Sequence, residues 1–244
     1  MSKNCYLIII VLLLSGNSLL AQAPAWGGGA DQNDLSFGFS FSYVNSYFKI
    51  DKKPNWRDPY FDPGTNRYLT DSLRSINSKN STGFAIGFLT RYRLTEHLEA
   101  RTTPSLVFAD RSLTYTYPNS SDNVTKQVQT TTFDFPLEMK LKSDRIGDFR
   151  AYILGGVKYT LAIGGKKTSD ADLDPLDKLV KNVGGFGSYE AGLGCDIYFE
   201  FFKLSPEIKI ANSFGNVLVP ENHPYSTPIS SLGLHTVTFS LIFE

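Results

Sequence analysis

The side chains that could carry out catalysis are few in this sequence. It contains three histidines, which are His97 in a predicted short turn, His223 in a predicted loop and His235 near the last apolar segment. None of them has a serine, cysteine or acid at the spacing of a nucleophile motif. A barrel lipase or protease would have to assemble its triad from separate loops, with His223 and Glu221 as the best available pair. Since a single histidine in a loop is more often solvated than catalytic, we predict no catalytic residue and no enzymatic activity.

Ligands for metals and cofactors are equally sparse. Cysteine and histidine do not occur at zinc-binding spacing, and Cys195 lies on an apolar face, where we expect a small filler. The four aspartates within 170–177 lack the glycine and the terminal glutamate of a calcium loop. We expect them on the solvated face of a short helix over 172–182, which Asp174 caps. The glycine pairs at 164–165 and 184–185 precede no helix that could hold a phosphate. From these observations together we predict no metal, no cofactor and no small-molecule substrate.

Most charged residues instead alternate with apolar residues, which is the pattern of β-strands with two unlike faces. Residues 35–43 read L-S-F-G-F-S-F-S-Y, with large apolar residues at odd positions and serine or glycine at even positions. The alternation recurs along the chain, and no helical layer is available to cover the aromatic face. We therefore predict an all-β fold, an eight-stranded antiparallel transmembrane β-barrel in contact with outer-membrane lipid. The residues predicted to face lipid are Phe37, Phe39, Phe41, Phe84, Phe88, Phe133, Phe135, Phe239, Leu241 and Phe243.

The connections between the predicted strands alternate in length. The strands span 35–48, 82–94, 98–117, 126–142, 149–163, 186–200, 203–214 and 231–243. Short connections lie at 95–97, 143–148 and 200–203, and longer ones at 49–81, 118–125, 164–185 and 215–230. This is the pattern of short periplasmic turns and long extracellular loops. Pro104, Pro136 and Pro206 fall inside strands, and each is expected at a bulge or near a rim because proline cannot donate to the ladder.

The opposite face of the strands is polar and often charged. The interior of an eight-stranded barrel is just wide enough for side chains to fill, so charges there must pair. We expect a salt-bridged plug that holds the barrel rigid; the alternative is a narrow ion path, and a general diffusion pore would need more strands. The candidate interior charges are Arg91, Arg101, Asp134, Glu138, Arg150, Lys158, Glu190 and Asp196, together with Arg93, Lys140, Glu200, Glu207 and Lys209.

The start of the chain has the features of an export signal. Lys3, the apolar run that begins at Tyr6 and the small residues around Ala23 are typical of a signal peptide. We divide the chain into a signal peptide at 1–23, a short periplasmic segment at 24–34 and an outer-membrane barrel at 35–244. Removal of the signal leaves 23 basic and 24 acidic residues, a net charge of −1, which argues against a nucleic-acid binder. One cysteine remains, so we expect no disulfide framework.

The connection at 49–81 differs in composition from the others. It has more apolar residues than a solvated loop requires, set among paired charges. Such a segment either packs on itself over the barrel mouth or docks a partner. Because tryptophan, tyrosine and arginine anchor protein interfaces, the candidate partner-binding residues are Trp56, Arg57, Asp58, Tyr60, Tyr68 and Arg74.

Three stretches in and after this connection carry a family resemblance. They are W-R-D-P at 56–59, L-T-D-S-L-R-S-I-N-S-K-N-S at 69–81 and G-F-A-I-G-F-L-T-R-Y-R-L-T-E-H-L at 83–98. With looser similarity at 111–117, 133–143 and the last strand, the chain resembles the PorT family (also called SprT), a component of the type IX secretion and gliding machinery of Bacteroidetes. The resemblance implies an outer-membrane barrel needed for export of cargo proteins, with no family catalytic residues to carry over.

The last strand departs from the usual pattern in one respect. Outer-membrane barrels usually end on an aromatic residue, whereas here Phe243 is followed by Glu244. The outward parity of Phe239, Leu241 and Phe243 is kept, so we still expect insertion by the barrel-assembly machinery.

Three functional hypotheses follow. The first is a non-catalytic component of type IX secretion, which docks other components of that machinery through 49–81 and 215–230. The second is a small surface-binding barrel unrelated to export. The third is a barrel enzyme acting on lipid or peptide, for which His223 is the candidate base.

Overall fold

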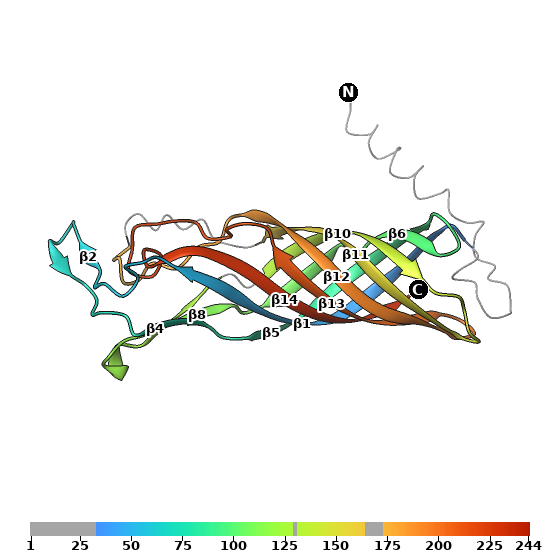
Figure 1. The fold of residues 1–244 in the computed structure, drawn as a ribbon, viewed down its shortest axis with the longest axis horizontal. Helices are drawn as coiled ribbons and strands as arrows, with labels where there is room; N and C mark the ends of the chain where they lie inside the picture. The colour runs from blue at the N-terminus through green and yellow to red at the C-terminus, as the bar shows by residue number, and fades with distance from the viewer. Residues whose placement is uncertain (1–32, 129–130, 164–172) are drawn as a thin grey trace, which may run out of the picture.

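The structure is a computed structural model that describes residues 33–128, 131–163 and 173–244, and these form one long closed β-barrel (Figure 1). The ring closes because β1 pairs antiparallel with β14 on one side and with β5 on the other. β6 and β7 follow one another between β5 and β10 and together count as one strand of the barrel wall. The predicted eight-stranded antiparallel barrel is therefore confirmed. The barrel strands are β1 (Leu35–Lys52), β5 (Ser81–Arg93), β6 (Leu98–Thr102), β7 (Ser105–Ala109), β10 (Thr131–Lys142), β11 (Phe149–Ala162), β12 (Gly185–Tyr198), β13 (Lys203–Ser213) and β14 (Ile229–Phe243).

The predicted signal peptide at 1–23 lies outside the described residues, as does most of the segment at 24–34. Among the residues described, no helix is both long and apolar enough to cross a membrane.

The connection at 49–81 contains more regular structure than the sequence indicates. β1 continues to Lys52, and a small hairpin of β2 (Phe61–Asp62) and β3 (Arg67–Tyr68) projects from one end of the molecule (Figure 1). β4 (Ser75–Ser78) then leads back toward the barrel. A chain that was expected as one loop therefore consists of a strand extension, a hairpin and a further strand.

The predicted strand at 126–142 is two strands. Only β10 belongs to the barrel, whereas β9 (Val124–Gln127) pairs with β8 (Ser112–Thr116). Because β8 also pairs with β4, these three strands form a separate sheet that prolongs the wall beyond the ring (Figure 1). A period of two is common to both sheets, so it does not reveal where one ends.

The two ends of the barrel differ in their connections. At one end, here called the turn end, the chain reverses between β5 and β6, between β10 and β11, and between β12 and β13. These reversals are tight: Leu94 donates to the carbonyl of Leu98 at 2.9 Å, and Phe199 donates to that of Phe202 at 2.9 Å. Gly147 has φ +62°, a conformation that favours glycine in the second reversal. The opposite end, here called the loop end, carries the long connections.

The three strand prolines lie where the ladder is interrupted. Pro104 occupies the break between β6 and β7. On the facing strand, Pro136 lies between the residues that pair with β7 and those that pair with β6, and its carbonyl accepts a hydrogen bond from Thr102 Oγ1 at 2.6 Å. Pro206 is opposite an unpaired stretch of β12. Each proline therefore sits beside a gap, where the missing donor is least costly.

The barrel interior changes character along its length. In the ring of eight it is charged, whereas at the loop end it is an apolar core that we call the cap. The cap consists of Phe48, Leu73, Ile76, Leu113, Tyr115, Tyr117, Val128, Val180, Phe186, Val217, Leu218, Tyr225, Ile229, Leu232 and Leu234.

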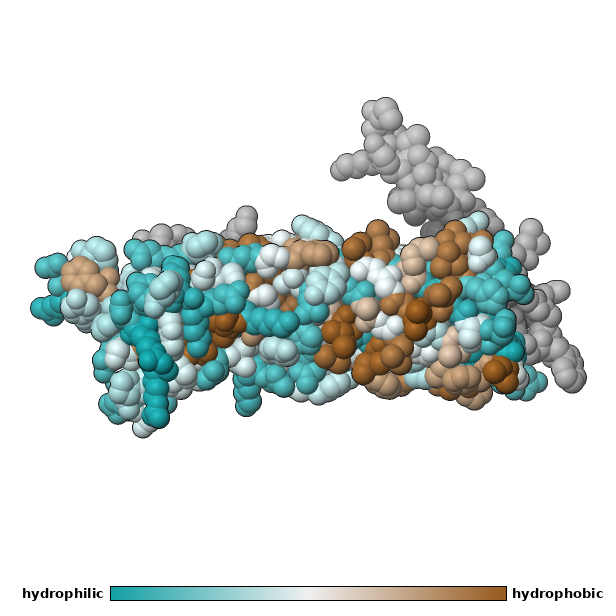
Figure 2. Space-filling view, in the orientation of Figure 1, coloured by the Kyte–Doolittle hydropathy of each residue, from teal (hydrophilic) through white to brown (hydrophobic). Residues whose placement is uncertain are grey.

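The exterior is apolar around the ring and polar around the cap. Figure 2 shows hydrophobic residues gathered over the turn-end half and hydrophilic residues over the loop-end half. Phe37, Phe84 and Phe88 are each more than half exposed, as expected for outward-facing side chains. Of the residues predicted to face lipid, Phe39, Phe41, Phe135 and Phe239 are also exposed, whereas Phe133, Leu241 and Phe243 are partly covered.

Candidate functional site

The middle of the barrel holds a cluster of ion pairs contributed by four strands. Arg101 on β6 donates to Glu138 on β10 at 2.6 Å and to Glu207 on β13 at 2.5 Å. Lys209 bonds Glu138 at 2.7 Å, and the Tyr152 hydroxyl on β11 donates to Glu207 at 2.9 Å. All five side chains point inward because they occupy alternate positions of their strands.

A second cluster fills the barrel nearer the turn end. Glu99 is fully buried and accepts from Arg91 at 2.9 Å and from Lys142. Lys140 bonds both carboxylate oxygens of Asp196 at 2.8 Å. Together the two clusters form what we call the plug, which consists of Arg91, Glu99, Arg101, Glu138, Lys140, Lys142, Asp196, Lys203, Glu207, Lys209 and Glu244.

The departure at the last strand has a structural reason. The Glu244 carboxylate accepts from Arg91 and, at 2.9 Å, from Lys203, and its side chain is only 3% exposed. Its backbone also pairs with Lys203 in both directions, at 2.7 Å and 3.0 Å. The residue after the final aromatic therefore belongs to the plug, which closes the barrel beside the turn end.

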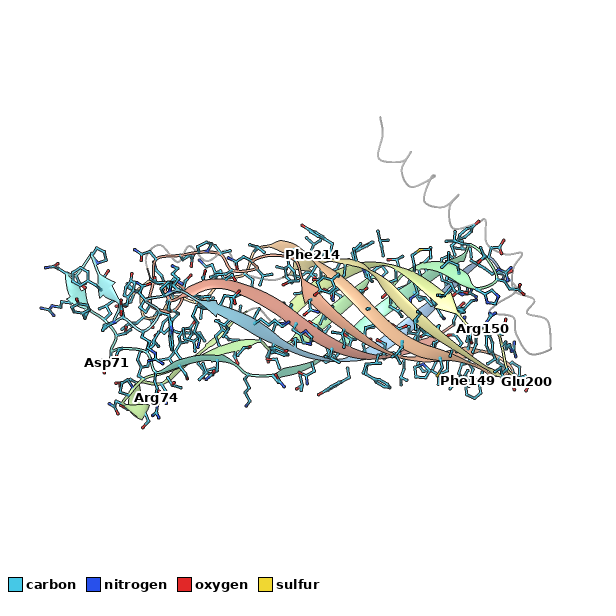
Figure 3. All side chains as sticks on the ribbon, in the orientation of Figure 1. Asp71, Arg74, Phe149, Arg150, Glu200 and Phe214 are labelled. Atoms are coloured by element: carbon cyan, nitrogen blue, oxygen red, sulfur yellow. The ribbon has the colours of Figure 1, made fainter. Side chains whose placement is uncertain are left out.

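The structure places most of the predicted interior charges inside the barrel. Of these, Lys158 bonds Asp134 at 2.8 Å, and Glu190 is 4% exposed. Arg150 is buried at the turn end, where it donates to the backbone carbonyls of Ser143 at 2.6 Å and Glu96 at 3.4 Å (Figure 3).

Two residues predicted inside the barrel are not there. Glu200 is exposed in the reversal between β12 and β13, because β12 ends at Tyr198 (Figure 3). Arg93 is at the end of β5 and bonds the exposed Asp34 at 2.7 Å. The prediction for Glu200 was wrong because β12 ends before it, whereas Arg93 keeps the parity of Arg91 but is the last residue of β5, where its side chain reaches the rim.

Sequence reasoning missed four members of the plug, namely Glu99, Lys142, Lys203 and Glu244. Inward strand parity marks three of them, whereas Glu244 follows the end of β14. Glu99 and Lys142 share the inward parity of Arg101 and Lys140, and Lys203 shares that of Glu207. They lie at strand ends, where the predicted boundaries are least certain.

The predicted catalytic pair lies in the cap region. His223 is fully buried, contrary to the solvated histidine that the sequence suggested. Its Nδ1 accepts from the backbone N–H of Tyr225 at 3.3 Å, and its Nε2 is 3.5 Å from Glu221 Oε2. Burial lowers the pKa of His223 to about 4, and Lys178, Lys181 and Lys126 act in the same direction. A neutral imidazole without access to solvent has no route to a substrate, so we assign it a packing role.

The predicted helix at 172–182 is wrong for the residues that the structure describes. Residues 174–177 form a single turn, in which Asp177 N donates to the Asp174 carbonyl at 2.8 Å. The Asp174 side chain accepts from Leu176 N at 3.0 Å, as a helix cap would, but the turn does not extend into a helix. Asp170 and Asp172 lie outside the described residues.

Two long connections meet at the loop end and enclose a groove of about 230 Å³. Its walls come from Lys53 to Leu73 on one side and from Asn222 to Pro228 on the other. The Tyr60 hydroxyl donates to the Asn222 carbonyl at 3.1 Å, and Lys53 N donates to the Pro228 carbonyl at 3.1 Å. The two connections named as docking candidates from the sequence are therefore in direct contact.

The groove collects half of the predicted partner-binding residues. Trp56, Asp58 and Tyr60 line it, and Arg57 covers the Trp56 ring at 5.0 Å. Tyr68 is on the β2–β3 hairpin, 70% exposed, with its ring 5.3 Å from that of Phe61, which does line the groove. Arg74 is not part of the groove: its backbone N–H bonds the Thr116 carbonyl at 2.8 Å beside the β4–β8 sheet (Figure 3).

The chain is similar to known outer-membrane proteins. The sequence matches the family described as "Outer membrane protein beta-barrel domain" over residues 23–219. A solved structure of OprG from Pseudomonas aeruginosa is 11% identical with a TM-score of 0.46, covering 86% of this chain and 93% of that one. Ail of Yersinia pestis, solved with the heparin analogue sucrose octasulfate, is 12% identical with a TM-score of 0.36, covering 86% and 99%. The Escherichia coli protease OmpT is 10% identical with a TM-score of 0.37, covering 86% and 93%.

A comparison with curated protein sequences gave no match. A closed antiparallel barrel with an apolar exterior and a charged interior defines an outer-membrane β-barrel protein. This chain belongs to the outer membrane protein beta-barrel domain family, and its place is the bacterial outer membrane.

Proposed function

We propose that this barrel is a non-catalytic component of the type IX protein secretion and gliding machinery, and that it acts by docking other components of that machinery. The observation that carries the proposal is the groove at the loop end, where Trp56, Asp58 and Tyr60 line one wall. These residues lie in and beside the W-R-D-P stretch on which the resemblance to the PorT family rests. Aromatic residues around a recess are typical anchors of protein interfaces.

The interior supports a scaffold role. Ion pairs between strands fill the ring, and the apolar cap closes the loop end above them. An eight-stranded barrel filled in this way has no wide aqueous path for cargo. We therefore infer that the protein works through its surface, as a rigid cylinder that presents the groove.

A belt of exposed apolar residues surrounds the ring of eight strands and indicates how the barrel is placed in the membrane. Phe37, Phe41, Phe84 and Phe88 are each more than half exposed on the ring, far more than a water-facing sheet would leave open. We propose that outer-membrane lipid covers this belt. The groove would then stand above the membrane surface, where another protein can reach it.

The proposal is tested by deleting the gene and following one secreted cargo through the periplasm, the cell surface and the medium. Accumulation of unprocessed cargo in the periplasm, rescued by the wild-type gene, is the expected result. Cargo that reaches the surface normally would instead favour a surface-binding barrel with no role in export.

Complementation with groove variants then tests the docking site. Replacement of Trp56 and Tyr60 by alanine removes two anchors, and we expect binding to the partner to weaken about 30-fold or more. Asp58→Arg reverses a charge on the same wall without removing apolar packing, so a matching defect separates docking from folding. Phe201→Ala is the matched control, because Phe201 is 90% exposed at the opposite end. Full export by both groove variants would remove these residues from the proposed interface.

A further inference from the structure

A small polar cavity of about 50 Å³ lies between the plug and the cap. Lys209 of the plug lines it together with Asp134 and Lys158, and Phe186 and Leu234 of the cap contribute apolar wall. Hydroxyl groups from several strands cover the rest, among them those of Ser42, Thr103, Ser188 and Thr236. A cavity of this size has room for about three water-sized groups.

Arg111 lines this cavity and is the feature that the plug does not explain. It lies between β7 and β8 and is 4% exposed. Its Nε donates to the Ser46 hydroxyl at 3.1 Å, and within the described residues its guanidinium forms no ion pair with a carboxylate. The plug cations, such as Arg101 and Lys140, each bond at least one carboxylate. A buried guanidinium that no carboxylate bonds directly is unfavourable.

Two acids line the cavity among the described residues, and neither is an ion-pair partner of Arg111. Asp134 accepts from Lys158 at 2.8 Å and from the Thr160 hydroxyl at 2.9 Å. Glu190 is 4% exposed, and within the described residues its Oε1 has no hydrogen-bond partner. Asp134 acts on Arg111 only from beyond ion-pair distance, and neither acid forms an ion pair with Arg111 within the described residues.

We propose that the cavity is a binding site for a small inorganic monovalent anion of the size of chloride, held by the Arg111 guanidinium. A guanidinium directs several N–H donors at an anion, and hydroxyl groups on the wall add further donors. Thr103 Oγ1 is buried in this cavity and has no hydrogen-bond partner among the described residues, so it is available for that purpose. The volume suits a monatomic anion, and the position makes the anion a link between the plug and the cap.

The first test compares the thermal unfolding midpoint of the purified barrel in detergent in sodium chloride and in sodium gluconate at equal ionic strength. Gluconate is too large for the cavity, so chloride alone should raise the midpoint, in a saturable way. At ten times the dissociation constant, the increase should be roughly 3–5 °C. Equal midpoints in the two salts would overturn the proposal.

Variants assign the effect to the residue. Arg111→Met removes the lone charge, so its midpoint should be the same in both salts and, in gluconate, no lower than that of the wild type. Arg74→Gln is the control, because Arg74 is exposed on the loop-end sheet, and it should keep the full chloride effect. A chloride effect that survives Arg111→Met would disprove the assignment.

A second measurement does not depend on any variant folding. Crystals of the wild-type barrel grown in sodium bromide should show an anomalous peak within hydrogen-bond distance of the Arg111 guanidinium. Density at that place without an anomalous signal would mean water, and the site would then not be an anion site.

Discussion

Between the turn end and the loop end, the interior of the barrel changes from charged to apolar, and the exterior changes in the opposite sense. In the ring, Arg101 is 5% exposed while Phe37 on the outside is 55% exposed. At the loop end, Leu232 is fully buried and the outside is hydrophilic (Figure 2). The same strand period of two serves both halves, because each strand presents its apolar residues wherever water is absent. What surrounds the wall therefore decides which face is apolar.

The two interiors also differ in what holds them together. In the plug, each buried charge depends on a specific partner, and the loss of one partner leaves an uncompensated charge. In the cap, apolar side chains pack without direction, and the loss of one leaves a cavity. The plug should therefore respond to mutation more sharply than the cap, and the following changes test that difference in order of expected effect.

The largest effect is expected for Arg101→Met. It removes the donor shared by Glu138 and Glu207, so two buried carboxylates lose a partner. We expect the free energy of unfolding in detergent to fall by at least about 3–5 kcal/mol, measured by denaturant titration. The matched double change Arg101→Met with Glu207→Gln removes one charge of each sign and leaves Glu138 paired with Lys209, so it should recover much of the loss. A single variant as stable as the wild type would show that the plug is solvated.

A smaller effect is expected for Leu232→Ala in the cap. Leu232 is fully buried within the apolar cluster, so truncation removes packing and leaves a cavity. We expect a loss of about 2–5 kcal/mol in the stability of the loop end, seen as faster hydrogen exchange in β8 and β9. Exchange in β10 to β13 at the turn end should not change. Faster exchange throughout would show that the two halves unfold as one unit.

The ring could be predicted from the sequence, and the cap could not. Period-two alternation fixes which residues of a strand point inward, so Arg91, Glu138 and Asp196 are assigned by parity alone. The cap joins Leu73 and Val217 from two separate connections with Leu113 from β8, and nothing local to any of them encodes that meeting. Arg111 shows the same limit within the barrel, since it lies between β7 and β8 and is not among the predicted interior charges.

His223 adds a pH dependence to the cap. Burial lowers its pKa to about 4 in the folded protein, below the ordinary histidine value of about 6.5. The unfolded chain therefore binds a proton first as pH falls, and cap stability should decrease between about pH 6.5 and 4, by on the order of 1–3 kcal/mol. Hydrogen exchange of β8 at pH 7 and pH 5 measures this loss. His223→Gln should flatten the dependence, and an unchanged slope would assign it to other groups.

The smallest effect is expected for Asp34→Asn, which removes the ion pair with Arg93 at the turn end. The pair has a separation of 2.7 Å, as close as the pairs of the plug, but the side chains are 33% and 62% exposed. Water screens such a pair, so the loss should be about 0–1 kcal/mol and should vanish at high salt. The loss caused by Arg101→Met should persist in the same salt, because the plug excludes water. Equal salt sensitivity of the two variants would mean that salt screens the buried ion pairs as strongly as the exposed one. The plug would then be accessible to water, and the contrast between the ring interior and the surface would be wrong.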